Sequence, residues 1–271
     1  MDLEDVRQRG IVLLGCGKMG SAMLAGWLVG GLPPNAVWVI DPKPSDWLNS
    51  LNGLHLNTAL PDSPAIVLIA VKPQVMDQAL PSIAGLGSGS TLFVTVAAGT
   101  PIRQYENILG RDAPIIRAMP NTPAAISKGI TALIGNGKAT EADLGLAEGL
   151  LSAVGQTIRL QDESQMDAVT ALSGSGPAYV FHLIECLAAA GVAEGLPEPM
   201  AMRLAKATVS GAGQLAETAP EEPDQLRINV TSPGGTTAAA LAHLMDGDSG
   251  LPPLMARAVT AAAARSRELA K

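Results

Sequence analysis

Three glycines near the start of the chain have the spacing of a loop that binds phosphate. An apolar run at residues 11–14 leads directly into Gly15, Gly17 and Gly20, and an apolar helical stretch follows. In such a loop the first glycine permits a tight turn, the second lets the backbone approach a pyrophosphate, and the third lets the helix pack closely on the strand. The helix N-terminus then presents free N–H groups and a positive dipole to the phosphates. The pattern predicts a dinucleotide site, which also contains Cys16, Lys18 and Met19.

Asp41 follows the next apolar run, residues 37–40, and lies about 20 residues beyond the glycine loop. At this position an acidic side chain accepts hydrogen bonds from the adenosine ribose hydroxyls, which favours NADH. Lys43 would instead bind the 2′-phosphate of NADPH if Pro42 turned Asp41 away from the ribose. An ordinary Asp-Pro turn with a solvated lysine has the same sequence. The residues therefore predict NADPH or NADH as the cofactor and leave the choice between them open.

Small residues and one lysine follow two later apolar runs. Residues 70–73 read AVKP, and residues 97–101 read AAGTP. The carboxyl ends of parallel strands line the ligand crevice of a doubly wound sheet, and Ala and Gly there leave room for a dinucleotide. The predicted cofactor residues outside the glycine loop are Asp41, Lys43, Asn57, Ala70, Val71, Lys72, Pro73, Ala97, Ala98 and Gly99.

Two unusual segments stand in the second half of the chain: LSGSGPAY at residues 172–179 and VTSPGGTT at residues 230–237. In the second segment Pro233 can begin a helix, and Gly234 and Gly235 expose backbone N–H groups that can hold a carboxylate. A plain, well-capped helix is the alternative interpretation. For the first segment, a structural N-cap at Ser175 is as good an interpretation as direct contact with a ligand.

Apolar runs alternate with helical stretches over the first half, as in βαβ units around a parallel sheet. We therefore predict an α/β, Rossmann-type domain over residues 1–161, with two extra strands that extend the sheet. The predicted strands are residues 11–14, 37–40, 65–71, 91–96, 114–118, 130–134 and 157–160. The predicted helices of this half are residues 19–29, 73–83, 102–109 and 141–154.

The strand pattern disappears after about residue 161, and residues 162–271 are predicted to form an all-α domain. The predicted helices are residues 164–173, 177–195, 197–217, 223–230, 234–246 and 252–270. Many of them carry Ala and Leu on more than one face, which predicts burial against another helix layer or another subunit. This half is therefore expected to bind substrate and to form the contact between subunits.

Composition excludes several classes of partner. A formal net charge of −7 over 271 residues supplies no broad basic face, so no nucleic-acid partner is predicted. Cys16 and Cys186 lie far apart and form no metal-ligand cluster, so we predict no metal site and a reducing compartment. Residues 179–196 are the closest approach to a membrane span, but charged residues interrupt them, so a buried helix is predicted. With an acidic first segment unlike a secretory signal, these features predict a cytoplasmic protein with no membrane partner.

The two segments at residues 172–179 and 230–237 resemble signatures of the pyrroline-5-carboxylate reductases. MPNTP at residues 119–123 and AVKPQ at residues 70–74 are also similar to segments of that family and stand in the same order. The resemblance covers residues 11–270. It implies hydride transfer from NAD(P)H to the imine carbon of 1-pyrroline-5-carboxylate, giving L-proline, the last step of proline biosynthesis.

The resemblance also implies roles for individual residues. The backbone of Thr236 and Thr237 would bind the substrate carboxylate, and the Thr237 hydroxyl would reach the ring nitrogen as the principal catalytic group. A threonine hydroxyl is a poor acid, so it would hydrogen-bond and position the substrate. The remaining substrate residues would be Glu163, Asn229, Ser232, Gly234 and Gly235. Assembly through the helical half as a dimer, or as a decamer of five dimers, is implied as well.

The chain departs from the family pattern before the second segment. It carries Glu222-Pro223 where many relatives have His-Pro, and Arg227 lies in a stretch where they have Leu-Lys-Asp. The ribose loop DPKP also differs from the Ser- or Arg-containing versions associated with NADPH, so cofactor choice stays open.

Two other functions fit part of the sequence. A β-hydroxyacid dehydrogenase has a similar domain order, but it needs a lysine on the helix after a glycine-rich junction, and the first later lysine here is Lys206. His182 on that helix is more simply a structural histidine than a base. A protein that only senses nicotinamide nucleotides would keep the glycine loop but would have no use for the TSPGGTT anion site.

Overall fold

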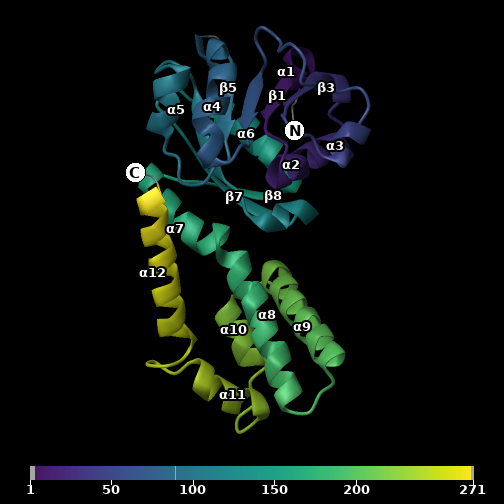
Figure 1. The fold of residues 1–271 in the computed structure, drawn as a ribbon. Helices are drawn as coiled ribbons and strands as arrows, with labels where there is room; N and C mark the ends of the chain where they lie inside the picture. Colours follow the sequence, from purple (N-terminus) through teal and green to yellow (C-terminus); the bar gives the residue numbers. More distant parts are fainter. Residues whose placement is uncertain (1–3, 89, 270–271) are drawn as a thin grey trace. The chain divides into compact units, whose positions relative to one another are not determined.

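The computed structural model describes residues 4–88 and 90–269. Its contacts divide the chain into two units (Figure 1): Met1–Gly174 with Ala263–Lys271, and Ser175–Ala262. The sequence-based boundary at residues 161 and 162 marks the end of the strand pattern, and it falls inside the first unit. The first unit continues because Met166 and Ala171, after the last strand, are buried. In addition, Ser266 donates a 2.6 Å hydrogen bond to Asp167 in the same unit.

The described residues of the first unit form a sheet of eight strands in the order β3-β2-β1-β4-β5-β6-β7-β8. All neighbours are parallel except β6 and β7, which run antiparallel. The extension of the sheet by two strands is confirmed. The strands are β1 Ile11–Leu14, β2 Val37–Ile40, β3 His55–Leu56, β4 Ile66–Ile69, β5 Leu92–Thr95, β6 Ile115–Met119, β7 Gly129–Gly135 and β8 Gly155–Arg159.

Helices cover both faces of this sheet, and each central strand contributes side chains to the two hydrophobic cores on these faces. In β1, Ile11 and Leu13 belong to one buried cluster, and Val12 and Leu14 belong to the other. The same alternation recurs in β4, which explains why both strands are continuous apolar runs. The first core packs against α1 Glu4–Arg9, α2 Lys18–Val29 and α6 Glu141–Leu151, and the second packs against α4 Met76–Ala79 and α5 Ile102–Leu109.

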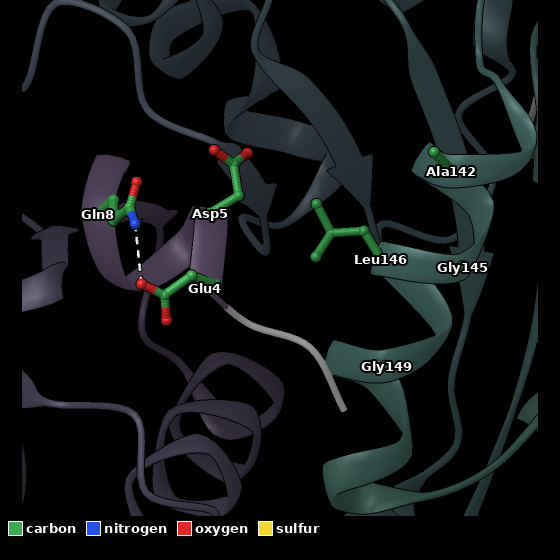
Figure 2. A pocket seen from close by; sticks show the side chains of 7 residues that line it. All are labelled: Glu4, Asp5, Gln8, Ala142, Gly145, Leu146 and Gly149. Carbon is green, nitrogen blue, oxygen red and sulfur yellow. Dashed lines mark hydrogen bonds between the residues drawn. The ribbon is translucent and has the colours of Figure 1, made fainter.

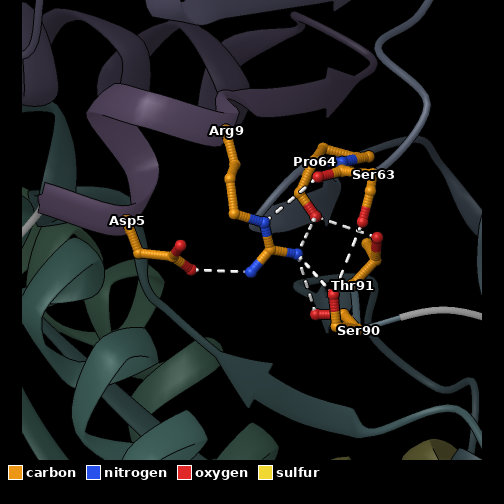
Figure 3. Close-up of polar contacts among 6 residues, drawn as sticks. All are labelled: Asp5, Arg9, Ser63, Pro64, Ser90 and Thr91. Atoms are coloured by element: carbon orange, nitrogen blue, oxygen red, sulfur yellow. Dashed lines mark hydrogen bonds and ion pairs between the residues drawn. The ribbon is translucent and has the colours of Figure 1, made fainter.

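Arg9 at the end of α1 holds the amino ends of two central strands together (Figure 3). Its guanidinium donates to the carbonyl oxygens of Ser63, Pro64 and Ser90, at 3.1 to 3.2 Å, just before β4 and β5 begin. It also pairs with Asp5 one turn earlier, at 2.8 Å. This edge is opposite to the carboxyl edge, where the predicted cofactor residues lie.

Several local elements differ from those predicted. The helix expected at residues 164–173 is instead the 3₁₀ turn η7 Glu163–Gln165, α7 Met166–Val169 and a π-helical turn at Thr170–Gly174. The single helix expected at residues 73–83 is instead the 3₁₀ turn η2 Pro73–Val75, α4, and the 3₁₀ turn η3 Leu80–Ser82. Pro81 explains the interruption, because it lacks an N–H donor and clashes with the preceding turn. The structure adds α1, α3 Asp46–Ser50 and β3, all too short to show a period. Helix α3 begins at an N-cap, Ser45, whose hydroxyl accepts from the Leu48 N–H.

The second unit is helical, as predicted, and its helices leave much apolar surface exposed. Helix α8 packs on α9 through small residues, since Ala188, Ala201 and Ala205 are buried. The burial expected for residues 179–196 is therefore wrong within a single chain: Phe181 of α8 is 58% exposed. The helices are α8 Gly176–Ala193, α9 Glu198–Thr218, α10 Pro223–Asn229, α11 Thr236–Leu244 and α12 Leu251–Leu269, whose last turns belong to the first unit.

One helical segment of the described chain, Glu163–Ala193, is long and apolar enough to cross a membrane, with a mean hydropathy of 1.4. Buried helices of soluble proteins can have the same length and apolar composition. Only 6% of the most apolar part of this segment is buried. Its apolar side chains therefore require burial against a surface that this chain alone does not supply.

Candidate functional site

The three glycines of the loop between β1 and α2 differ in what surrounds them. Gly15 has φ +89°, and a Cβ there would lie 2.8 Å from the Val71 side chain. A Cβ on Gly20 would lie 2.5 Å from the carbonyl oxygen of Gly15, so only glycine lets the helix approach the loop. At Gly17, the N-cap of α2, a Cβ would meet nothing within 4 Å. The loop is thus tight on its inner side and open at its middle glycine.

Asp41 lies directly beside this loop. Its Oδ2 accepts from the Cys16 N–H at 2.8 Å, and its Oδ1 accepts from the Lys43 N–H at 2.8 Å. Asn57, with φ +52°, binds the Asp41 backbone in both directions, accepting from its N–H at 2.9 Å and donating to its carbonyl at 2.8 Å. Pro42 therefore does not turn the Asp41 carboxylate away from the loop.

Ser21, which was not among the predicted site residues, also stabilises the glycine loop. Its hydroxyl lies 3.0 Å from the Cys16 carbonyl and 2.7 Å from the Gly17 carbonyl. The sequence contained a signal for this contact, because a serine one turn into a helix can donate a hydrogen bond to a carbonyl of the preceding loop. Cys16 itself is buried, and burial raises the pKa of its thiol, with the hydrogen bond to Ser21 opposing and the charge of Asp41 adding to that shift.

Three exposed lysines belong to the predicted cofactor set: Lys18 at the start of α2, Lys43 after Asp41, and Lys72 before η2. Within residues 4–88 and 90–269, none of them forms a salt bridge. Their charges, together with the N-terminus of α2, make this edge of the sheet suitable for phosphate groups.

Buried hydroxyl groups stabilise the loop after β5, residues 96–101. Thr95 donates a 2.6 Å hydrogen bond to the hydroxyl of Tyr105, and Thr100 is also buried. Burial raises the pKa of Tyr105, while the two threonines and the Arg117 charge act in the opposite direction. Of the predicted residues, Ala97 and Gly99 are buried, Ala98 is exposed, and Gly99 has φ +76°.

Glu163 is tied to the same loop. Its Oε1 accepts from the Arg117 guanidinium at 2.7 Å and from the Ile102 N–H, at the start of α5, at 2.9 Å. Arg117 was not among the predicted site residues, although a charged residue inside the apolar run PIIRAM is a signal for a buried function.

Two of the segments that carry the family resemblance contact each other. Asn121 of MPNTP accepts from the Ile130 N–H at 3.0 Å and donates to the Ser173 hydroxyl at 3.3 Å. A Cβ on Gly174 would lie 2.5 Å from the Met119 methyl group, so this glycine permits close packing. Residues 170–174 form a π-helix, a geometry that occurs often at functional sites. Ser175 is the N-cap of α8, but its side chain makes no capping bond.

The TSPGGTT segment lies in the second unit and differs in part from its expected geometry. Helix α11 begins at Thr236 after the N-cap Gly235, so Pro233 precedes the helix instead of beginning it. The Gly235 N–H donates to the Ser232 carbonyl at 3.0 Å, so it is not exposed as expected. Gly234 has φ +70° and makes the turn into the helix.

Thr236 and Thr237 are the first two residues of α11, whose leading N–H groups have no acceptor within the helix. Thr236 is exposed and Thr237 is half-buried. Asn229 ends α10, and its side chain accepts from Gln225 at 2.8 Å. The predicted cofactor residues and Glu163 thus lie in the first unit, while the other predicted substrate residues lie in the second.

Comparisons with known proteins match nearly the whole chain. Residues 163–269 match the family model "Pyrroline-5-carboxylate reductase dimerisation", and residues 10–99 match "NADP oxidoreductase coenzyme F420-dependent". The pyrroline-5-carboxylate reductase of Pseudomonas aeruginosa is 37% identical over 96% of this chain and 97% of its own. The chain belongs to the pyrroline-5-carboxylate reductase family.

Solved reductases have the same fold. The enzyme from Coxiella burnetii superposes with a TM-score of 0.91 at 34% identity, covering 97% of this chain and 99% of its own. The Plasmodium falciparum enzyme, whose structure has NADP bound, superposes with a TM-score of 0.83 at 27% identity and covers 98% and 99%. The fold predicted from this chain's sequence, a Rossmann-type domain followed by a helical half, is confirmed.

A surface hollow between α1 and α6 of this reductase family member has a volume of about 640 Å³ (Figure 2). The polar side chains Glu4, Asp5 and Gln8 line one wall, and the small or apolar residues of α6 line the other. None of the predicted cofactor or substrate residues lines it. The hollow is thus not the candidate site.

Proposed function

We propose that this chain catalyses the NAD(P)H-dependent reduction of 1-pyrroline-5-carboxylate to L-proline, the last step of proline biosynthesis. The observation that carries the proposal is family membership over nearly the whole chain.

The test is the loss of reduced-nicotinamide absorbance when the purified protein is mixed with 1-pyrroline-5-carboxylate and either NADPH or NADH. Steady oxidation that requires the substrate supports the reductase. Binding of the cofactor without oxidation would overturn the proposal and favour a nucleotide sensor. Comparing the two cofactors side by side would also decide the preference that Asp41 and Lys43 leave open.

The carboxyl edge of β1, β2, β4 and β5 would hold the cofactor. Gly17 leaves the loop open to a pyrophosphate, and the N-terminus of α2 faces that space. The Asp41 carboxylate, held beside the loop by the Cys16 N–H, would accept the adenosine ribose hydroxyls. The exposed lysines supply positive charge, so the residues present fit a dinucleotide of either kind.

In this proposal α11 would bind the substrate. The unpartnered N–H groups at Thr236 and Thr237 suit a carboxylate, and the Thr237 hydroxyl would hydrogen-bond the ring nitrogen. Ser232, Gly234 and Gly235 shape the turn that precedes them, and Asn229 and Glu163 complete the proposed set. A reduced nicotinamide supplies the hydride for the imine carbon, and the protein's own groups bind and orient the substrate.

The helical half would form the contact between subunits. Its region matches the dimerisation family model, and its helices expose large apolar side chains that a second copy would cover. We propose a dimer through this surface, with a decamer of five dimers as the larger assembly. The exposed residues of α8 and α9 that support it are Val180, Phe181, Leu183, Leu187, Val192, Met200, Leu204 and Leu215.

A cytoplasmic location remains part of the proposal. Both cysteines are free thiols, which suits a reducing compartment. A second copy on the exposed face of α8 would also account for its apolar surface without a membrane. Fractionation of cells producing the tagged protein tests this point, because recovery in the membrane fraction would contradict it.

A further inference from the structure

Arg117 is a buried cation with one acidic partner. Its side chain is 6% exposed and lies 2.7 Å from Glu163, whose side chain is 33% exposed. Breaking a buried ion pair leaves an uncompensated charge and is costly, so Arg117 strongly restricts where the Glu163 carboxylate can lie. By contrast, the pairs of Arg9 with Asp5 and of Arg159 with Glu141 have both side chains at least 29% exposed.

The carboxylate held in this way also holds a helix start. The oxygen that accepts from Arg117 accepts from the Ile102 N–H at 2.9 Å, and Ile102 is the first residue of α5. A negative charge is favourable at a helix N-terminus. Since residues 97–101 directly precede α5, the pair fixes the far end of the loop that follows β5.

Directly before the loop, the Thr95 hydroxyl at the end of β5 donates to the Tyr105 hydroxyl of α5, and this bond fixes the near end. The loop is thus anchored on both sides. Asp41 lies after β2, on one side of the glycine loop, so the adenosine half of a dinucleotide would lie there. The opposite half would extend past β4 towards β5, where this loop lies.

We propose that Arg117 is a positioning residue: through Glu163 it holds the loop of residues 97–101 against the nicotinamide half of the cofactor. The inference rests on the proposed function and deepens it. Arg117 does not touch the substrate or the cofactor in this account. Its effect is to hold the nicotinamide in one position, a placement on which hydride transfer depends steeply.

The test compares binding of NADPH with binding of its fragment that lacks the nicotinamide ring, 2′-phospho-ADP-ribose, for the full-length wild type and for Arg117→Met. If NADH is the better ligand, NADH and ADP-ribose replace them. Binding is measured without substrate, by calorimetry. We expect Arg117→Met to weaken the whole cofactor by about tenfold and the fragment by less than about twofold. Equal weakening of both ligands, or of neither, would overturn the inference.

Glu163→Gln provides a second variant. It removes the charge but keeps an acceptor for the Ile102 N–H, so it is less prone to misfold than Arg117→Met. The double variant should lose no more cofactor affinity than Arg117→Met alone, because both changes remove one interaction. The matched control is Arg159→Met, which breaks ion pairs with Glu141 and Glu148 in the same unit, away from the loop. It should leave the ratio of the two affinities unchanged.

Turnover gives a separate readout. Arg117→Met should lower kcat by about tenfold or more, whereas the control should stay within about twofold. If the wild type binds both ligands but does not reduce 1-pyrroline-5-carboxylate, the proposed function fails, and the affinity ratio still decides the role of Arg117. An unchanged affinity ratio in a reductase that is active would defeat the positioning role alone.

Discussion

Two carboxylates, Asp41 beside the glycine loop and Glu163 beside the start of α5, accept hydrogen bonds from backbone N–H groups of neighbouring segments. Hydrogen bonds to charged groups contribute roughly 1.5–3 kcal/mol each, more than neutral ones. These side chains therefore hold loops as well as presenting a charge. A substitution at either position is expected to move the backbone of the site, so isosteric changes are the most informative.

Thr237→Ala is expected to lower turnover without weakening reduced-cofactor binding, because the hydroxyl belongs to the proposed substrate segment. Loss of one neutral hydrogen bond costs roughly 0.5–1.5 kcal/mol, and up to about 3 if a buried partner is left unsatisfied. This corresponds to a loss in kcat/KM of about severalfold to a hundredfold. Steady-state kinetics with Thr237→Ser as the control, which keeps the hydroxyl, checks the assignment. Wild-type kinetics for the Ala variant would remove Thr237 from the site.

Gly17→Val should weaken both NADPH and NADH while the protein stays folded. A Cβ at this position meets no protein atom within 4 Å, so the added side chain would occupy space proposed for the pyrophosphate. Calorimetric titration gives the affinities, and thermal unfolding gives the stability. Gly137→Val is the control, since Gly137 also has no atom near its Cβ and lies between β7 and α6. Equal cofactor affinity in the two variants would exclude the loop from the site.

Asp41→Asn should raise the use of NADPH relative to NADH. The amide keeps an acceptor for the Cys16 N–H, which now bonds to Asp41 at 2.8 Å, but it removes the charge that would repel a 2′-phosphate. Asp41→Ser, which shortens the side chain, should act in the same direction. The ratio of kcat/KM for the two cofactors is the measurement. If that ratio does not move in either variant, the carboxylate serves only to hold the loop.

At the scale of elements, helix α1 is joined to the amino edge of the sheet mainly by one side chain. Arg9 bonds to segments before β4 and β5, although α1 itself is six residues long. An isolated helix of that length is not stable in water. Its position therefore depends on this contact and on the buried side chain of Val6.

Arg9→Met should lower the free energy of unfolding by about 1–3 kcal/mol, because charged hydrogen bonds to the two segments before β4 and β5 are lost. The exposed pair with Asp5 should contribute little of that. Chemical denaturation measures the change, and kcat should be unaffected because the contact lies at the edge opposite the cofactor residues. Arg7→Met is the control, since Arg7 makes a single long contact, 3.4 Å, to Gly31. Equal stability of the two variants would show that Arg9 does not anchor α1.

At the scale of the whole molecule, the second unit does not bury its own apolar surface. Helix α8 is rich in large apolar side chains, yet its buried residue is Ala188. A contiguous exposed patch of this kind is unusual for a monomer. Together with the match to the dimerisation family model, this exposed surface indicates that the stability of the folded chain depends on self-association.

Sedimentation equilibrium should give a dimer or a larger multiple of it. Phe181→Glu, at a side chain 58% exposed in the single chain, should shift the protein towards monomer and reduce activity, because a charge would be desolvated in the contact. Ile158→Glu, at a side chain 52% exposed on β8, is the control and should keep the assembly. A monomeric wild type that is fully active would contradict the proposed dimer.

The sequence alone determined the elements whose signal is local. The bounds of β1 and β2 are those predicted, and the glycine loop lies between β1 and α2, because apolar runs and glycine spacing are properties of a few consecutive residues. The order of the seven predicted strands also followed from this pattern. The family resemblance identified the segments that lie at the start of α8 and α11.

Tertiary structure decided the features that depend on distant residues. The two-residue strand β3 has too short a pattern to predict, and it forms by pairing with β2, where His55 stacks on Trp38 with ring centroids 4.2 Å apart. The antiparallel direction of β7 is likewise set by the chain path. The pairing of Arg117 with Glu163 joins residues 46 positions apart, which no local period encodes. The apolar composition of α8 predicted that the helix would be buried. Its apolar side chains are exposed in the single chain, so a surface outside this chain must bury them. The sequence of one helix does not determine which surface packs on it.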